Sequence, residues 1–460
     1  MIELNQVSFR YAEMEKQALY DISLKVDKGK CLVISGSSGC GKTTITRIIN
    51  GLIPSFYPGE LSGSVKINGE DISRLEPHEL AMQIGSVFQN PRTQFFNTDT
   101  DSEIVFGMEN CGIAYEEMHC RYEKTVNDLN LNKLCGRDIF ALSGGEKQQI
   151  AFGSVYALSP EIYVLDEPSA NLDKVSILRL REILLQLKNS GKTLLISEHR
   201  LYYLRDIADQ VALIHEGKLT GLYDMNKLAT VPIETLNSMG LRTLYDIKIS
   251  PSPQSCPSRI PALDIRNLSV KIGGETVLED INLSADYGEI IGIIGENGAG
   301  KSSLARTVCG LIKENSGDIY LSGQLMNSRR RKLFTFLVMQ DPNYQLFSDS
   351  VIGEVSITVS GEIPILEDVQ KILSSLELTD VINRHPLSLS GGQKQRLCVA
   401  LAALSHAEVL FFDEPTSGLD FKNMNRVAKI LKELSKKKSI LVISHDNEFL
   451  HLVCTRIIAL

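Results

Sequence analysis

The sequence predicts two α/β domains, each built around a glycine-rich phosphate-binding loop. The main observation is an internal repeat, because the glycine loop at residues 36–43 (GSSGCGKT) returns at residues 295–302 (GENGAGKS). A short apolar run, residues 32–34 and 290–294, precedes each loop, as expected of a buried parallel strand that leads into a loop and a helix. With 460 residues and 43% apolar content, the chain can bury two hydrophobic cores.

The repeat also sets the predicted domain boundaries. Matching residues keep the same order, while the interval between the copies falls from 259 residues (Lys42 to Lys301) to 246 (His199 to His445). The insertions therefore lie in connecting segments, the largest being the Pro- and Gly-containing stretch 52–60. We place the first domain at residues 1–230, a linker at 231–261 and the second domain at 262–460. Residues 249–258 of the linker are rich in Pro and Ser and have too little apolar surface to pack, which predicts an extended connection.

Composition and charge exclude several classes of protein. The net charge of −8 disfavours nucleic-acid binding, which depends on Lys and Arg that neutralise phosphates. The basic run Arg329-Arg330-Arg331-Lys332 is expected to be the solvated start of a helix, with contact to nucleic acid or lipid as the alternative. No stretch reaches the roughly 20 apolar residues that span a bilayer, and the N-terminus lacks the parts of a signal peptide, so we expect a cytosolic protein. Nine scattered cysteines without a Cys-x-x-Cys pair argue against a zinc site or a disulfide framework.

The glycine loops predict two ATP sites that also hold Mg²⁺. Glycines let successive backbone N–H groups turn toward the phosphates, and the N-terminus of the following helix adds a favourable dipole. The loop lysines would reach the β and γ phosphates, and the hydroxyl after each lysine would bind Mg²⁺. The predicted contacts are Gly36, Ser37, Ser38, Gly39, Cys40, Gly41, Lys42, Thr43 and Thr44 in the first loop, and Gly295, Glu296, Asn297, Gly298, Ala299, Gly300, Lys301, Ser302 and Ser303 in the second. Cys40 is either an inert filler at a variable loop position or a thiol activated by the helix dipole.

Paired carboxylates follow two further apolar runs. Residues 162–165 end in Asp166-Glu167, and residues 409–412 end in Asp413-Glu414. A buried strand of this kind delivers both carboxylates to the edge of the sheet where open α/β folds bind ligands. The first carboxylate of each pair suits the Mg²⁺ shell, and the second suits polarisation of the water that attacks the γ-phosphate.

A second anion-binding motif precedes each carboxylate pair by 23 residues. It reads Leu-Ser-Gly-Gly, and its predicted site residues are Ser143, Gly144 and Gly145 in the first copy and Ser390, Gly391 and Gly392 in the second. Serine can cap the helix that follows, and the glycines expose N–H groups at the positive end of that helix.

This ordered set resembles the ATP-binding cassette (ABC) family over essentially the whole chain. The resemblance implies that each domain has a mixed β-sheet core, an antiparallel β subdomain and a helical subdomain. It adds Gln89 and Gln340 as Mg²⁺ and water sensors, His199 and His445 as γ-phosphate contacts, and Asp173 and Asp420 in the loops after the carboxylate pairs, beginning at Ser169-Ala170-Asn171 in the first copy. It also implies head-to-tail pairing of the two domains, so that Lys42 works opposite Ser390 and Gly392, and Lys301 works opposite Ser143 and Gly145.

The segments after Gln89 and Gln340 suggest a branch of the family. Residues 90–96 (NPRTQFF) and 341–347 (DPNYQLF) look like those of the ATPases of energy-coupling-factor importers, which take up vitamins and transition-metal ions. In that branch the segment receives coupling helices of a membrane-embedded subunit, which makes Phe95, Phe96 and Phe347 expected docking residues; ordinary core aromatics are the alternative. The resemblance thus implies an ATPase subunit on the cytoplasmic face of the cell membrane.

Two other functions compete with the importer subunit. A soluble tandem ABC protein acting on ribosomes or DNA is disfavoured, because such relatives carry a charged helical linker, zinc modules or coiled-coil insertions, which this sequence lacks. A nucleotide sensor without turnover is disfavoured by the presence of both Glu167 and Glu414.

One departure from the family pattern distinguishes the two copies. Tyr11 stands where an aromatic residue normally stacks on adenine, whereas the equivalent position of the second copy is Ile272. We therefore expect the second site to bind ATP more weakly.

Overall fold

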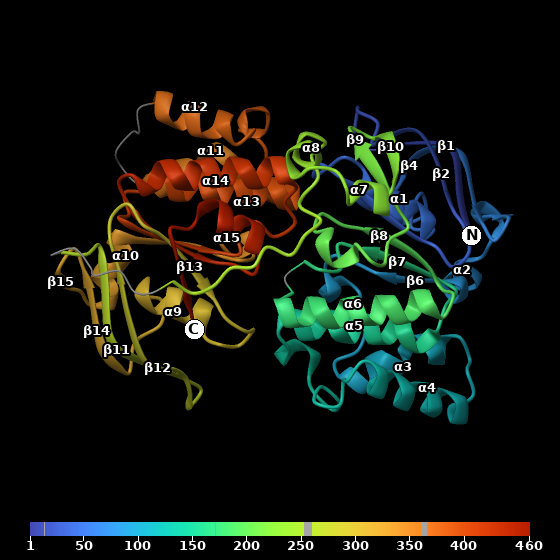
Figure 1. The fold of residues 1–460 in the computed structure, drawn as a ribbon, viewed down its shortest axis with the longest axis horizontal. Coiled ribbons are helices and arrows are strands. Elements are labelled where there is room, and N and C mark those ends of the chain that lie inside the picture. Colours follow the sequence, from blue (N-terminus) through green and yellow to red (C-terminus); the bar gives the residue numbers. More distant parts are fainter. Residues whose placement is uncertain (13, 171, 253–259, 360–365) are drawn as a thin grey trace. The chain divides into compact units, whose positions relative to one another are not determined.

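The computed structural model describes residues 1–12, 14–170, 172–252, 260–359 and 366–460, without the side chains of Arg92 and Leu366. The chain divides into two compact units, Met1–Tyr245 and Asp246–Leu460. Each unit has the predicted α/β architecture with a separate antiparallel sheet (Figure 1). Within the part of the chain that the structure describes, no helix is long and apolar enough to cross a membrane.

The first unit combines a core sheet with an antiparallel sheet. The core sheet has the order β10-β9-β3-β8-β7-β6, in which β10 is antiparallel to β9 and the other strands pair in parallel. The antiparallel sheet has the order β2-β1-β4-β5. The strands are β1 (Ile2–Tyr11), β2 (Leu19–Val26), β3 (Cys31–Gly36), β4 (Gly59–Ile67), β5 (Glu70–Asp71), β6 (Ile84–Val87), β7 (Ile162–Asp166), β8 (Thr193–Ser197), β9 (Gln210–His215) and β10 (Lys218–Asp224).

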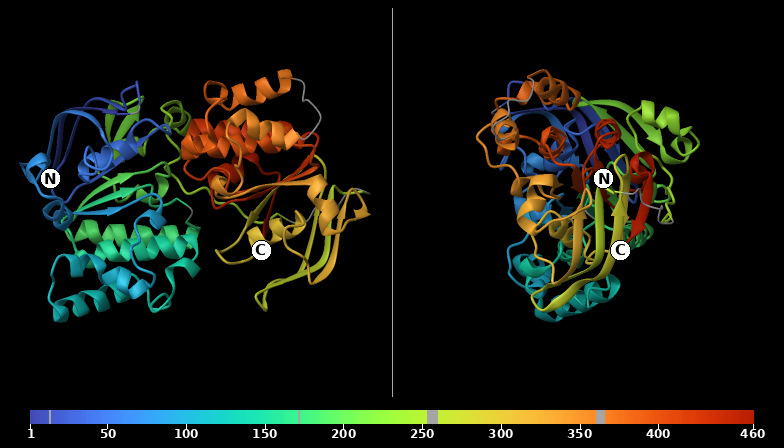
Figure 2. Two further views of the ribbon diagram at one scale, coloured as in Figure 1. Left: turned by 180° about the vertical axis from the view of Figure 1, so that it is seen from behind. Right: turned by 90° about the vertical axis from the view of Figure 1, so that its left-hand side faces the viewer.

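Helices cover both faces of this core sheet. Alternation along β3 places Leu32 and Ile34 in a core shared with α1 and the antiparallel sheet, while Cys31 and Val33 join the core under the larger helices. Helices α3 and α4 lie beyond α5 and α6 as seen from the sheet, which forms a helical subdomain (Figures 1 and 2). The helices are α1 (Lys42–Ile49), α2 (Pro77–Gln83), α3 (Thr100–Asn110), α4 (Tyr115–Asp128), α5 (Gly144–Leu158), α6 (Lys174–Asn189), α7 (Met225–Leu228) and α8 (Ile233–Ser238).

The second unit repeats this plan. Its antiparallel sheet has the order β12-β11-β14-β15, and its core sheet has the order β16-β17-β18-β13-β19 with parallel pairing. The strands are β11 (Leu263–Ile272), β12 (Glu275–Ala285), β13 (Ile290–Ile294), β14 (Ser316–Leu321), β15 (Gln324–Leu325), β16 (Thr335–Val338), β17 (Val409–Asp413), β18 (Ser439–Ile443) and β19 (Arg456–Ala459). The helices are α9 (Lys301–Val308), α10 (Ser328–Phe334), α11 (Val351–Val359), α12 (Leu366–Ser375), α13 (Gly391–Leu404), α14 (Phe421–Ser435) and α15 (Asn447–Val453).

The predicted linker, residues 231–261, is largely built into the two units. Helix α8 and the residues after it pack on the helical core of the first unit, where Leu236, Leu241 and Leu244 are buried. On the other side, the backbone N–H of Ser252 donates to the carbonyl of Ile457 at 2.8 Å, so Ser252 attaches to the edge strand β19. The prediction of an extended connection over residues 253–259 lies outside the described residues. Apolar residues at 236, 241 and 244 explain why the linker prediction was too long.

The basic run in α10 corrects a second prediction. Arg331 is fully buried, and its guanidinium donates to both carboxylate oxygens of Glu314 at 3.0 and 2.6 Å and to the carbonyls of Met326 and Thr307. Arg331 therefore does not lie on a solvated face. Its charge can be buried because a carboxylate pairs with it and two carbonyls accept its hydrogen bonds.

Candidate active site

The glycine loops connect β3 to α1 and β13 to α9. Lys42 Nζ donates to the carbonyls of Gly36 and Ser37, both at 3.2 Å, and Lys301 Nζ donates to those of Gly295 and Glu296 at 2.9 and 2.8 Å. Each ammonium thus lies across its loop, at the N-terminus of the following helix. This combination of a cation, backbone amides and a helix dipole suits a polyphosphate.

Glycine is required where each loop enters its helix. Gly41 and Gly300 have φ angles of 106° and 90°, in the left-handed region. A Cβ on Gly41 would lie 2.6 Å from the side chain of Leu19, and one on Gly300 would lie 2.7 Å from that of Leu278. The two loops are therefore closely packed against the antiparallel sheets, which fixes their backbone.

The first carboxylates of the predicted pairs end β7 and β17. Burial and the adjacent Glu167 charge raise the pKa of Asp166 to about 6, although the neighbouring hydroxyls of Ser197 and Thr43 and the charge of Lys42 oppose this shift. Burial likewise raises the pKa of Asp413, opposed by a hydrogen bond from Ser302. Asp166 is thus close to Thr43, and Asp413 is close to Ser302, which are the hydroxyl residues predicted to bind Mg²⁺ with them.

The fit to Mg²⁺ rests on the unsatisfied state of Asp166. Its buried Oδ1 atom has no hydrogen-bond partner among the residues that the structure describes. No group of three or more His, Cys, Asp and Glu side chains in the described ranges could hold a metal by itself. One carboxylate and one hydroxyl next to a phosphate loop match the way Mg²⁺ is usually bound, with few protein ligands and with substrate phosphates. A bound Mg²⁺ would supply positive charge there against the β and γ phosphates.

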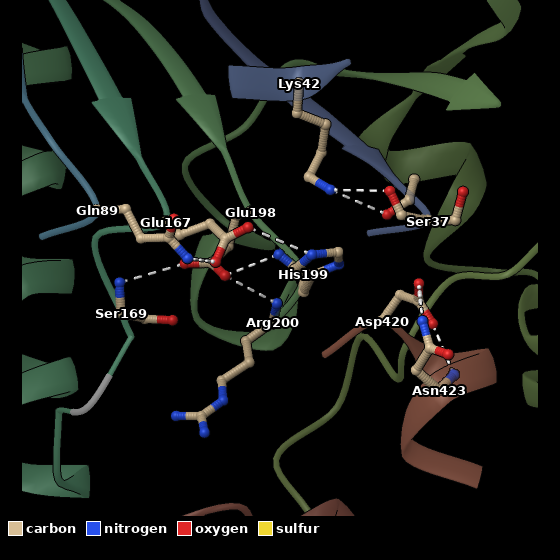
Figure 3. A network of polar contacts seen from close by, with 11 residues as sticks. Ser37, Lys42, Gln89, Glu167, Ser169, Glu198, His199, Arg200, Asp420 and Asn423 are labelled. Atoms are coloured by element: carbon tan, nitrogen blue, oxygen red, sulfur yellow. Dashed lines mark hydrogen bonds and ion pairs between the residues drawn. The ribbon is translucent and has the colours of Figure 1, made fainter. Parts of the chain in front are cut away.

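Glu167, His199 and Gln89 meet beside the first glycine loop (Figure 3). Gln89 Nε2 donates to Glu167 Oε2 at 2.7 Å, and His199 Nε2 lies 3.4 Å from Glu167 Oε1. Burial raises the pKa of Glu167, but the adjacent His199 ring, the charge of Lys42 and the hydrogen bond from Gln89 outweigh burial and bring the pKa below its ordinary value. The carboxylate is therefore ionised near neutral pH and able to accept a proton from water.

The backbone of Glu167 and Glu414 is held in an unusual conformation. Their φ angles are 47° and 49°, which non-glycine residues rarely adopt. Hydrogen bonds from their backbone N–H groups to Ser197 and Ile443 on the neighbouring strands fix this conformation at 2.8 and 2.9 Å. The same local backbone geometry thus occurs in both copies.

The second unit assembles the same groups with different contacts. Ser444 Oγ and the backbone N–H of His445 donate to the Glu414 carboxylate at 3.0 and 2.9 Å. The His445 ring lies farther from Glu414, at 3.8 Å, and its Nε2 is 3.1 Å from Asn297 Oδ1 in the glycine loop. Gln340 follows β16 and is exposed.

The Leu-Ser-Gly-Gly motifs form helix N-termini as predicted. Ser143 and Ser390 are the N-caps of α5 and α13, where each side chain accepts from the backbone N–H three residues on and completes a capping box. Ser143, Gly144, Ser390 and Gly391 are exposed. Each motif therefore presents a helix N-terminus at the surface of its own unit.

Asp173 and Asp420 have a structural role that the sequence reasoning did not assign. Their carboxylates cap α6 and α14 by accepting from the backbone N–H of Ser176 and Asn423 at 2.8 and 2.7 Å. Contact of either aspartate with nucleotide stays a prediction, and the predicted motif residue Asn171 lies outside the described residues.

The predicted adenine positions of the two units have different surroundings. The hydroxyl of Tyr11 lies 3.1 Å from Thr44 Oγ1 and accepts from Arg47 at 3.2 Å, so its ring lies beside the first turns of α1. Ile272 is 45% exposed at the end of β11. The second unit thus presents an aliphatic side chain where the first presents a fixed aromatic ring.

Cys40 is buried in the core shared by α1 and the antiparallel sheet. Its sulfur lies close to Gly36, since a Cβ on that glycine would be 3.0 Å away from Sγ. The interpretation of Cys40 as an accessible, activated thiol is therefore wrong, and the residue fills space behind the loop.

The segments after Gln89 and Gln340 are fixed by residues that the sequence reasoning missed. The buried carboxylate of Glu103 accepts from the backbone N–H groups of Phe96 and Asn97, and that of Glu354 accepts from Phe347 and Ser348. These glutamates occupy equivalent positions of the repeat, which is the signal that could have identified them.

The amide side chains of Gln94 and Gln345 also support these segments. Each side chain donates to a carbonyl of the preceding strand and accepts from the backbone N–H just after it. The three docking candidates differ in exposure: Phe96 and Phe347 are 75% and 81% exposed, whereas Phe95 packs against the helical core. The half-buried Phe95 therefore fits the alternative of an ordinary core aromatic better, and docking stays a prediction for Phe96 and Phe347.

Comparison with known proteins identifies the architecture. The family model described as ABC transporter matches residues 19–170 and 278–417. A protein of Treponema denticola assigned as an ABC transporter ATP-binding protein is 47% identical over 469 residues, covering 100% of this chain and 95% of that protein. A similarly assigned protein of Methanosarcina mazei is 31% identical over 514 residues, covering 100% of this chain and 87% of its own length.

Solved structures share the fold. The structure titled "Model of ribosome-bound archaeal Pelota and ABCE1" has a TM-score of 0.72 at 21% identity, covering 98% of this chain and 76% of that chain. The structure titled "RNase-L Inhibitor" has a TM-score of 0.67 at 21% identity, covering 98% and 87%. At this identity the likeness concerns the tandem fold alone.

Proposed function

The chain belongs to the ABC transporter ATPase family, and from this premise we propose that it is the ATPase subunit of an importer of the energy-coupling-factor type. Its two ABC domains hydrolyse ATP to ADP and phosphate. In the proposed reaction Glu167 and Glu414 polarise the attacking water, while Lys42 and Lys301 hold the phosphates. The two domains pair head to tail, and uptake of a vitamin or metal ion is coupled to the resulting cycle of pairing and release.

The observation that carries the importer assignment is the surface after Gln89. Phe96 is exposed although Glu103 holds its backbone, and its ring stacks on that of Phe106 at 4.9 Å between centroids. Beside this pair lies a groove of about 310 Å³ that α2, β6 and α3 line in part, with Leu80 and Leu158 among its apolar residues. A fixed aromatic surface next to an apolar groove suits a short helix of a membrane-embedded partner.

Phe347 extends the same argument to the second unit. Glu354 holds its backbone as Glu103 holds that of Phe96, while the ring stays in solvent. Two buried glutamates that hold exposed phenylalanines in equivalent segments support docking better than they support a core role. We therefore propose one membrane contact for each unit.

The test is co-purification of the chain with membrane subunits, followed by mass spectrometry of the bound proteins. The variant with Phe96→Ser and Phe347→Ser should lose these subunits while its ATP hydrolysis in isolation stays near the parental rate. Tyr115→Ser is the matched control, because Tyr115 is 76% exposed on α4, away from the groove. Retention of the subunits by the double variant would refute the docking surface.

Head-to-tail pairing has its own test. If Lys42 and Ser390 serve one composite site, Lys42→Ala and Ser390→Ala should be strongly non-additive in a double-mutant cycle of ATP hydrolysis. Multiplicative losses would mean that each domain acts alone.

The second candidate is a soluble tandem ABC protein that acts on ribosomes. Its support is the full-length likeness to the ribosome-bound structure, a likeness of fold at 21% identity. Recovery of the chain with ribosomes and not with membranes in the same fractionation would favour this candidate.

A further inference from the structure

Glu198 is a buried carboxylate next to the proposed catalytic groups. The side chain is 2% exposed and accepts four hydrogen bonds. Two come from the backbone N–H groups of His199 and Arg200, at 2.7 and 3.1 Å. The others come from the backbone N–H of Ser169 at 3.3 Å and the hydroxyl of Tyr203 at 2.8 Å.

Three of these donors, the backbone N–H groups of Ser169, His199 and Arg200, lie on two separate loops (Figure 3). The fourth donor, Tyr203, follows His199 and Arg200 in the same stretch of chain. Ser169 follows β7 two residues after Glu167, whereas His199 and Arg200 follow β8. Glu198 therefore ties the loop that starts at the catalytic carboxylate to the loop that carries the histidine. Between these loops the His199 ring and the Glu167 carboxylate approach to 3.4 Å.

The hydrogen bonds that Glu198 accepts depend on its negative charge. Four donors converge on one carboxylate, and charge-assisted hydrogen bonds of this kind are stronger than neutral ones. Burial and the charge of Glu198 raise the pKa of Tyr203 well above its ordinary value, so the phenol keeps the proton that it donates. Removal of the carboxylate would leave buried donors unsatisfied in both loops.

The second unit makes the same tie with a carboxylate from another position. Ser444 replaces the glutamate before the histidine, and Asp446 follows the histidine instead. Thr416 Oγ1, at the position equivalent to Ser169, donates to Asp446 Oδ2 at 3.2 Å. Phe449 stands where the first unit has Tyr203, so the phenol is absent where no carboxylate precedes the histidine.

We propose that Glu198 is a positioning residue for ATP hydrolysis in the first site, and that Asp446 does the same work in the second. Glu198 sets the distance between the Glu167 carboxylate and the His199 ring by joining their loops. A displacement of about 1 Å at a reacting group can cost about a hundredfold in rate, so the tie acts on the chemical step more than on ATP binding.

The experiment uses the full chain with Glu414→Gln, so that hydrolysis reports mainly on the first site. Single-turnover hydrolysis of radiolabelled ATP is measured with protein in excess, which gives a maximal rate constant and a half-saturating protein concentration. Glu198→Ser should lower the rate constant about tenfold or more and change the half-saturating concentration less than about threefold. Deuterium uptake should rise in peptides that contain Ser169 and His199.

The second unit supplies the rescue. The variant Glu198→Ser/Arg200→Asp/Tyr203→Phe copies the residues of the second unit and should recover most of the rate and the protection from exchange. Asp209→Ser is the matched control, because Asp209 also accepts a backbone hydrogen bond, from Cys31 at 2.8 Å, at the opposite end of β3. It should leave the rate constant near that of the parent.

Two results would overturn the proposal. One is a Glu198→Ser chain that hydrolyses ATP at the parental rate. The other is a triple variant that unfolds at the parental temperature yet stays as slow as Glu198→Ser. The assay contains no membrane or ribosomal partner, so its outcome is separate from the choice between the importer and ribosome functions.

Discussion

The two predicted adenine positions carry different residues, Tyr11 in the first unit and Ile272 in the second. This difference gives the sharpest prediction about nucleotide binding. Tyr11 is fixed by Thr44 and Arg47, so its ring needs little ordering when adenine stacks on it. Ile272 is 45% exposed and offers only an aliphatic contact. An aromatic stack is worth about 0.5–1.5 kcal/mol, so we expect the second site to bind ATP about two- to tenfold more weakly than the first.

Equilibrium titration with ATP in two disabled backgrounds resolves the sites. Lys301→Ala leaves only the first site able to bind ATP, and Lys42→Ala leaves only the second. In these backgrounds Tyr11→Ile should weaken the first site and Ile272→Tyr should strengthen the second, while Tyr11→Phe, which keeps the ring, should change affinity less than Tyr11→Ile.

Equal affinities, or an Ile272→Tyr variant that binds as its parent does, would refute the reasoning. The proposed head-to-tail pairing offers a specific explanation for such a result. Phe140 is 74% exposed and lies three residues before Ser143, which the proposed head-to-tail pairing sets opposite Lys301. Phe140→Ala would then weaken the second site.

Three further predictions follow. Glu167→Gln combined with Glu414→Gln should preserve ATP binding and lower hydrolysis at least ~10²-fold, as measured by phosphate release; near-parental turnover would show that neither carboxylate is the base. Glu314→Ala leaves the buried Arg331 guanidinium without its carboxylate and should destabilise the second unit by about 3–5 kcal/mol. Calorimetry would detect this change as an unfolding transition lowered by roughly 6–20 °C. An unchanged transition temperature would show that water replaces the carboxylate. Maleimide should label Cys40 slowly with or without Mg-ATP because the thiol is buried, and fast labelling that Mg-ATP blocks would restore the activated-thiol interpretation.

Much of the catalytic arrangement could be predicted because it follows from strand ends. Asp166 ends β7, and His199 lies two residues after the end of the adjacent parallel strand β8, so both residues are at the same edge of the sheet. The order of the motifs and the apolar runs before them were enough to predict that these residues lie close together. The capping serines at 143 and 390 were predictable for a similar reason, since capping depends on local sequence alone.

The buried charges could not be predicted in this way. Arg331 belongs to a basic run, which is typical of a solvated face, and its partner Glu314 lies 17 residues earlier in a loop that the first copy builds differently. Burial of Cys40 likewise depends on how the glycine loop packs against β1 and β2. Such outcomes depend on which distant donor and acceptor the fold brings together, and a single sequence does not contain that pairing.

The repeat shows that what the two sites share is a hydrogen-bond requirement more than a set of identical residues. Both loops after the carboxylate pairs need an acceptor from the histidine loop, and the chain supplies it once as Glu198 and once as Asp446. The acceptor of the second unit lies two positions later in the repeat than that of the first, and Phe449 stands where the first unit has Tyr203. Because the backbone donors in the first unit belong to fixed loops, such a shift of the acceptor requires a change in its neighbours. A single-residue exchange between the units would therefore fail where a concerted exchange succeeds. It follows that comparison of the two copies position by position underestimates their functional similarity, because it counts a relocated carboxylate as a loss.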